Sequence, residues 1–139
     1  MADKHAPDYG MKPLHLSAYG NAYAEDYSIT DKPAANDKLY LGIIPAGIRV
    51  HAIQLIHGAA GVGATIKLGF EPVDPIGPTT DDDAFLAAGT DVAAAGVKAS
   101  VGQPITFNSP VKIVATVGAA FVNSVALTAV VTGKVVGAP

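Results

Sequence analysis

Two runs near the C-terminus decide the fold: VKIVATV at residues 111–117 and VALTAVV at residues 125–131. In both runs apolar side chains recur at every second position, which is the period of a strand with one face toward a core. The runs overlap a longer stretch, residues 113–133, that carries no charge and is nominally long enough to cross a bilayer as a helix. Because Gly118, Asn123 and Ser124 interrupt that stretch, we predict two strands joined by a loop and no membrane partner.

Upstream of these runs, short β-rich segments alternate with turn residues at intervals of about ten residues, a pattern typical of an all-β sandwich. We expect strands at residues 39–44, 48–57, 64–70, 97–101, 105–107, 111–117 and 125–136. The apolar positions of 48–57 change parity midway, which predicts a β-bulge or a strand covered on both faces. The fold class predicted is an antiparallel β-sandwich, jelly-roll-like, with Pro45-Ala46-Gly47 as one of its turns.

The connection at residues 71–96 is too long for a tight hairpin. Thr80 has the side chain of a helix cap, and Asp81, Asp82 and Asp83 would then stand in a first turn, where the helix dipole favours negative charge. We therefore expect a short helix that ends at Gly89.

Composition limits the classes of function. The chain has 139 residues, of which 50% are hydrophobic and 15% charged, so it is long and apolar enough for one folded core. It has no cysteine, which excludes disulfides, cysteine-ligated metals and thiol nucleophiles. A net charge of -3 with a single arginine leaves no basic footprint for nucleic acid.

No motif with catalytic chemistry is complete. The glycine-rich run at residues 58–65 lacks the lysine of a phosphate-binding loop, and the aspartates between residues 74 and 91 lack the ligand spacing of a calcium loop. His51 and His57 would be about 20 Å apart on an extended strand, so we expect both to be surface or rim residues. We predict no catalytic, cofactor-binding or metal site, and hence no enzyme.

Residues 1–38 differ from the rest. They hold ten of the 21 charged side chains and four of the five tyrosines, and they show no sustained helix or strand period. We therefore predict an extended N-terminal arm (1–38) joined to a sandwich domain (39–139). Tyrosine is enriched at interfaces, so the expected partner contacts of the arm are Tyr9, Tyr19, Tyr23 and Tyr27. In the body, we expect Ile53, Leu55 and Phe121 to pack between subunits.

The segment LGIIPAGIRV at residues 41–50, the glycine-rich bend and the closing pair at 111–117 and 125–131 resemble small tailed-phage virion proteins of the head decoration, or capsid cement, type. The resemblance covers residues 39–136 and consists of strand and turn patterning. It implies a β body on the outer capsid surface of a virion, which binds the major capsid protein at junctions between capsomers and strengthens the shell.

Apolar faces beyond those needed for one sandwich core also predict a homo-oligomer packed around a local axis, for which we favour a trimer. Two other functions stay open: a carbohydrate-binding sandwich, and a tail or baseplate adhesion component. The body lacks tryptophan, which disfavours an aromatic sugar platform.

Overall fold

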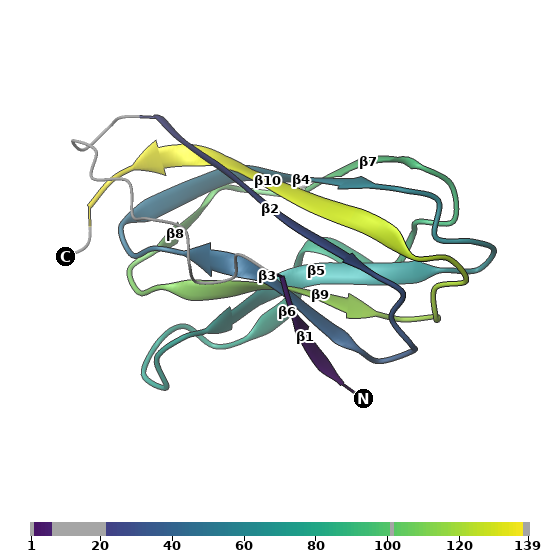
Figure 1. Ribbon diagram of the computed structural model, residues 1–139. Helices are drawn as coiled ribbons and strands as arrows, with labels where there is room; N and C mark the ends of the chain where they lie inside the picture. Colours follow the sequence, from purple (N-terminus) through teal and green to yellow (C-terminus); the bar gives the residue numbers. More distant parts are fainter. Residues whose placement is uncertain (1, 7–21, 101, 138–139) are drawn as a thin grey trace.

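A computed structural model of the chain describes residues 2–6, 22–100 and 102–137. Within these residues there are ten strands and no helix, and the strands form two sheets packed face to face (Figure 1). The strands are β1 (Asp3–His5), β2 (Ala22–Asp31), β3 (Lys38–Ile44), β4 (Ile48–His57), β5 (Thr65–Pro72), β6 (Asp81–Asp91), β7 (Gly96–Ala99), β8 (Ile105–Phe107), β9 (Val111–Val117) and β10 (Val125–Val135). The predicted fold class, an all-β sandwich, is confirmed.

The chain changes sheet at most of its connections. One sheet, called here sheet A, has the order β1-β3-β9-β5-β6; the other, sheet B, has the order β2-β10-β4-β7, and β8 also pairs with β4. All the pairs are antiparallel except β1 with β3, which is parallel. The two predicted C-terminal strands are thus central strands of different sheets, β9 in sheet A and β10 in sheet B.

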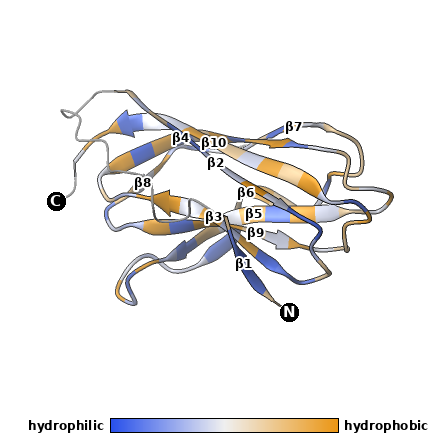
Figure 2. Ribbon diagram, viewed as in Figure 1, coloured by the Kyte–Doolittle hydropathy of each residue, from blue (hydrophilic) through white to orange (hydrophobic). Residues whose placement is uncertain are grey.

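The core lies between the sheets, where apolar residues from alternate positions of the strands meet (Figure 2). Its largest fully buried side chains include Leu39, Leu41, Ile53, Leu55 and Ile66. The outward positions of β4 and β10 are mostly exposed or half-buried, so the alternation visible in the sequence is the alternation of inside and outside.

The predicted irregularity in 48–57 is a β-bulge. Thr132 of β10 lies opposite Ala52, whereas the next residue, Gly133, lies opposite Val50, so His51 is the extra residue of β4. The extra residue changes the parity of the strand, and this is why both Val50 and Ile53 are buried although they are three positions apart.

The helix expected from Thr80 to Gly89 is wrong, because this segment is strand β6. It pairs with β5 across an irregular register, in which Leu68 lies opposite Leu86 and Phe70 opposite Asp81. Phe85 and Leu86 are both buried against the core. The backbone hydrogen bonds along the edge of β5 and this apolar burial outweigh the capping preference of a few side chains, which is a weak local signal.

The described residues of the predicted arm belong to the sandwich. β1 pairs with β3 over Asp3 to His5, and β2 pairs with β10 over its whole length. Residues 2–6 and 22–38 therefore do not form an arm outside the body, and the boundary expected at residue 38 falls at the start of a strand of the same domain. No helix in the described part of the chain has the length and hydropathy of a membrane span.

Candidate interaction surfaces

The inner face of β2 carries two of the tyrosines that were expected to bind a partner. Tyr23 and Tyr27 are 5% and 3% exposed, and their hydroxyl oxygens lie 3.4 Å apart. The Tyr27 hydroxyl donates to the carbonyl oxygen of Ile43, 2.9 Å away, which ties sheet B to sheet A. Burial raises the pKa of Tyr23 above its ordinary value, as expected for a phenol that is withdrawn from water.

Gly42 makes room for this contact. A Cβ at Gly42 would overlap the aromatic ring of Tyr27, so the ring packs directly on the backbone of β3. The expectation that Tyr23 and Tyr27 offer contact area to a partner is thereby corrected: both are used inside the chain. Tyr9 and Tyr19 lie outside the described residues.

The three body residues expected at a subunit interface are also core residues. Ile53 and Leu55 are fully buried on β4, and Phe121 is 3% exposed in the β9–β10 loop. The backbone N–H of Phe121 donates to the carbonyl oxygen of Pro33, 3.1 Å away, which ties this loop to the segment between β2 and β3. The apolar character of these three residues correctly predicted that they are buried. The sequence did not show that they are covered by other strands of the same chain and not by a second subunit.

Asp37, a buried carboxylate just before β3, organises the N-terminus. Its Oδ1 accepts the backbone N–H of Ala2 at 2.9 Å and its Oδ2 accepts that of Ala34 at 3.0 Å. These two hydrogen bonds, with a smaller contribution from Lys4, hold the pKa of Asp37 below its ordinary value despite burial. Lys4 also pairs with Asp31 at 2.9 Å. The N-terminal strand is thus fixed by polar contacts that can form only in the folded chain.

The outer face of sheet A is covered by a polar network around Glu71. Lys38 lies 2.9 Å from one carboxylate oxygen of Glu71, and the hydroxyl of Tyr40 donates to the other at 3.2 Å. Lys112 lies 3.9 Å from Glu71 and 5.2 Å from the centroid of the Tyr40 ring. The hydrogen bond to Glu71 raises the pKa of Lys38. On the other side of Tyr40, the ring of His5 stacks at 4.7 Å between centroids.

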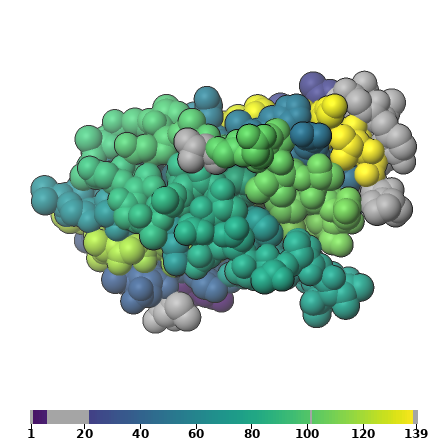
Figure 3. All heavy atoms as spheres, turned by 180° about the vertical axis from the view of Figure 1, so that it is seen from behind, coloured from purple at the N-terminus to yellow at the C-terminus, as the bar shows by residue number. Residues whose placement is uncertain are grey.

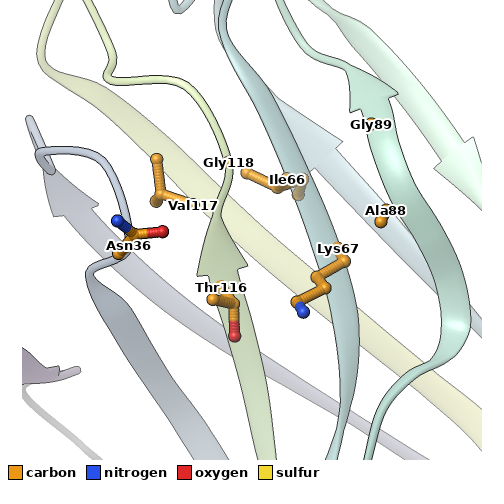
Figure 4. Close-up of a pocket in the computed structure, with 8 residues that line it drawn as sticks. All are labelled: Asn36, Ile66, Lys67, Ala88, Gly89, Thr116, Val117 and Gly118. Atoms are coloured by element: carbon orange, nitrogen blue, oxygen red, sulfur yellow. The ribbon is translucent and has the colours of Figure 1, made fainter.

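A small depression opens between β9, β5 and β6 (Figure 4). Its volume is about 150 Å³, and it is lined by Asn36, Ile66, Lys67, Ala88, Gly89, Thr116, Val117 and Gly118. The ammonium of Lys67 already pairs with Asp82 at 2.7 Å. The lining holds no second titratable side chain within reach of a proton transfer, so the depression offers no acid–base pair.

Three loops at one end of the sandwich contain no charged side chain. The loops at residues 58–64, 92–97 and 118–124 meet there, and none of them contains Asp, Glu, Lys or Arg. Backbone hydrogen bonds join the three loops: Ala60 N–H to Val92 O, Gly61 N–H to Ala93 O, and Val122 N–H to Ala60 O, the last at 2.8 Å. Val62 and Val122 remain 94% and 57% exposed. We call this surface the uncharged end.

The β5–β6 loop projects from the opposite end, where it stands out from the body at the lower right of Figure 3. Ile76 at its tip is 89% exposed. The loop is ordered by its own turn, in which the backbone N–H groups of Ile76 and Gly77 donate to the side chain and carbonyl of Asp74. The loop therefore holds an exposed apolar side chain on a backbone that its own hydrogen bonds order.

The remaining candidate groups lie apart. His51 is exposed, as predicted, but His57 is 4% exposed with its Nδ1 3.1 Å from the carbonyl oxygen of Gly58, so the expectation of a surface position is wrong for His57. Asp83 has a raised pKa because it shares a hydrogen bond with Asp81. No group of three or more potential metal ligands occurs in the residues that the structure describes.

Sequence reasoning missed Asp37, Glu71 and Gly42. Asp37 lies in the motif Ala-Asn-Asp just before a strand, and this motif predicts a turn. The motif does not show that the Asp37 carboxylate accepts a hydrogen bond from Ala2, 35 residues away. Glu71 and Gly42 have no local signal, since their partners come from strands that are far apart in the sequence. The tyrosine pattern of residues 23 and 27 gave a signal for burial that we assigned to a partner.

Comparison with solved structures finds the same two-sheet fold in chains of phage capsids. A chain from the capsid of Ralstonia phage GP4 superposes with a TM-score of 0.75 at 20% identity, over 99% of each chain. A chain from the acidic stable capsid structure of Helicobacter pylori bacteriophage KHP30 gives 0.63 at 20% identity, covering 86% of this chain and 92% of that one. A chain from the cyanophage Pam1 capsid asymmetric unit gives 0.62 at 17% identity, with coverage of 94% and 98%.

No protein-family model and no curated protein matches the sequence. The likeness at these identities defines the class by fold: a single antiparallel β-sandwich of the kind found in those capsid chains.

Proposed function

We propose that this chain is a structural, non-enzymatic component of a phage virion that decorates the outer surface of the capsid and stabilises it by binding the major capsid protein at capsomer junctions. The observation that carries the proposal is the fold likeness to the GP4 capsid chain, which extends over 99% of both chains. Among the described residues, no three His, Asp or Glu side chains are grouped so that they could hold a metal ion.

The uncharged end and the β5–β6 loop are the surfaces that we propose for capsid contact. Both expose apolar side chains on backbone that is already ordered by hydrogen bonds, so little conformational entropy is lost on docking. The surfaces lie at opposite ends of the sandwich, so one molecule can reach across a junction between two capsomers. The arm tyrosines Tyr9 and Tyr19, and the trimer, remain predictions.

The proposal is tested by co-sedimentation of the purified chain with expanded phage capsid shells that lack decoration. We expect saturable binding, because a decorating protein has a fixed number of sites on each shell. Val62→Asp places a charge at the uncharged end without disturbing the core, and we expect it to weaken binding at least about tenfold. Ala24→Asp, on the exposed face of β2, is the matched control and should bind like the parent.

Binding that does not saturate, or that Val62→Asp and Ala24→Asp alter equally, would contradict the proposed contact surface. A parent chain that stays in the supernatant at every shell concentration would contradict the proposed function itself.

A further inference from the structure

The edge of β3 in sheet A is a built acceptor site for a short strand, and β1 occupies it. The backbone N–H of Ala6 donates to the carbonyl oxygen of Tyr40, and that of Lys38 donates to the carbonyl oxygen of Ala2, both at 3.0 Å. At the start of the strand, the backbone N–H of Ala2 donates to Asp37. The acceptor therefore binds both ends of a five-residue segment, residues 2–6.

The acceptor also recognises the side chains of that segment. Asp31 and Asp37 both face the Lys4 ammonium, at 2.9 and 3.9 Å, so an acidic site receives a basic side chain. One residue further, the His5 ring stacks on Tyr40. This combination of backbone pairing and charge complementarity is the mode by which extended peptides add to a sheet edge.

Within the described residues, the pairing of β1 with the body is short. The strand is three residues long and pairs on one side in a parallel ladder, whereas β2 pairs over ten residues. In the segment 2–6, Ala6 is the only buried residue, and it is small. Such an element can leave its site at a far lower cost than a core strand, as short edge elements generally do.

The length of the connection between β1 and β2 allows residues 2–6 to bind the acceptor site of their own molecule or that of a second molecule. Residues 7–21 separate Ala6 in sheet A from β2 in sheet B, and 15 residues can span about 50 Å when extended. Ala6 lies beside Tyr40 and Ala22 lies opposite Lys134 at the far end of sheet B, so within one chain the connection bridges the roughly 10 Å between packed sheets and part of the length of the sandwich. A segment on so long a connection can reach the acceptor of its own chain or that of an adjacent chain.

We propose that residues 2–6 of one copy bind the acceptor site of a second copy, so that β1 is exchanged between neighbouring molecules. Every contact made within one chain is reproduced between chains, and the exchange therefore needs no new surface. Crowding raises the local concentration of foreign segments and favours the exchanged form. The inference deepens the proposed function, in which copies stand side by side on a shell, but its test needs no capsid.

The test uses the absence of cysteine from the chain, which makes introduced thiols the only ones present. Asp3 and Lys38 are Cα partners in the β1–β3 ladder, so cysteines at these positions are placed for a disulfide. Purified Asp3→Cys and Lys38→Cys chains are mixed in equal amounts, incubated across a range of protein concentrations and oxidised. We expect a mixed disulfide-linked dimer whose yield rises with concentration and exceeds that of the control pair about tenfold at the highest concentration.

The control pair is Asp3→Cys with Val62→Cys, because Val62 is 94% exposed at the uncharged end and reports random collisions. Adding Asp37→Ala to the Lys38→Cys chain should reduce the mixed dimer, since it removes the acceptor of the Ala2 N–H. A single chain with both cysteines should close internally at low concentration.

Mixed dimer at the level of the control pair, at every concentration, would overturn the exchange. So would failure of the doubly substituted chain to close, because β1 would then not lie against β3. Either result leaves capsid co-sedimentation unaffected, so the two proposals fail separately.

Discussion

Two strands from the N-terminal quarter of the chain, β1 and β2, differ in how many residues they pair and in which contacts hold them in their sheets. β2 pairs with β10 along ten residues, from Ala22 opposite Lys134 to Asp31 opposite Val125, and buries two aromatic rings. β1 pairs with β3 over three residues and is held by Asp37, Lys4 and His5 through polar and stacking contacts. β2 is therefore part of the core, whereas β1 is bound to it much as a ligand is bound.

The difference teaches that a segment without a visible strand period can still be structural. The large side chains that β2 buries are tyrosines, and a tyrosine in a sequence is equally consistent with a core position and with an interface position. Burial depends on whether the chain itself supplies the covering surface, and here Gly42 of β3 supplies it. The predictions below test this contrast between β2 and β1.

The largest effect is expected for Tyr27→Ala in β2. It removes a buried ring and leaves a cavity between the sheets, so the free energy of unfolding should fall by about 3–5 kcal/mol. Tyr27→Phe keeps the ring and removes the hydroxyl, with its hydrogen bonds to Ile43 and Tyr23, and should cost about 1 kcal/mol. Chemical denaturation of both variants measures the difference, and a loss below that of the phenylalanine variant would mean that β2 is not part of the core.

Gly42→Ala should come next. The added methyl group overlaps the Tyr27 ring, and overpacking of this kind costs about 1–3 kcal/mol of unfolding free energy. In a chain that already carries Tyr27→Ala the overlap is gone, so Gly42→Ala should cost much less there. A double-mutant cycle from denaturation curves measures the coupling. Additive losses would show that the ring does not rest on this glycine.

Asp37→Ala should act on β1 and leave β2 in place. With the carboxylate gone, the Ala2 N–H loses its acceptor, and the strand should open more often. Hydrogen exchange at the Ala6 and Lys38 amides, which bond across the β1–β3 pair, should accelerate about tenfold while the β2 amides keep their protection. Asp26→Ala on the exposed side of β2 is the control and should change neither set. If hydrogen exchange accelerated equally at the β1–β3 amides and at the β2 amides, Asp37 would not hold β1 specifically.

The smallest effect is the acid dependence of β1. The pKa of Asp37 is lowered in the folded chain from its ordinary 3.8, so its contribution to β1 docking is fully present above that value. As the pH falls through the lowered value, the carboxylate is protonated in the folded state as well and the contribution is lost. Protection of the Ala6 amide should therefore decline below about pH 4 in the parent but stay flat in Asp37→Ala. A decline of the same size in the variant would assign the acid sensitivity to another group.

Much of the fold was predictable because its strands carry a period of two that is independent of distant residues. Residues 39–44, 48–57, 111–117 and 125–136 were placed nearly at the observed strands. The change of parity inside 48–57 predicted either a bulge or a strand covered on both faces, and the register shows the bulge, at His51. The helix expected at Thr80 failed because an acidic first turn is a local preference, whereas β6 is held by pairing with β5.

The candidate surfaces were less predictable. The absence of charge at residues 58–64, 92–97 and 118–124 is visible in the sequence, but only the fold brings these loops together at one end. Conversely, Ile53, Leu55 and Phe121 were recognised as apolar, and only packing showed that they are covered from within.

The sequence by itself determined an all-β chain with an uncharged stretch at residues 113–133, no cysteine and a single arginine, because composition and the period of two are properties of each residue and its near neighbours. Only the tertiary structure decided that Tyr27 rests on Gly42, that Asp37 receives the N-terminus and that Glu71 joins three strands. These contacts join residues that are far apart in the chain, and their energies depend on distances and burial that exist only once both sheets have formed.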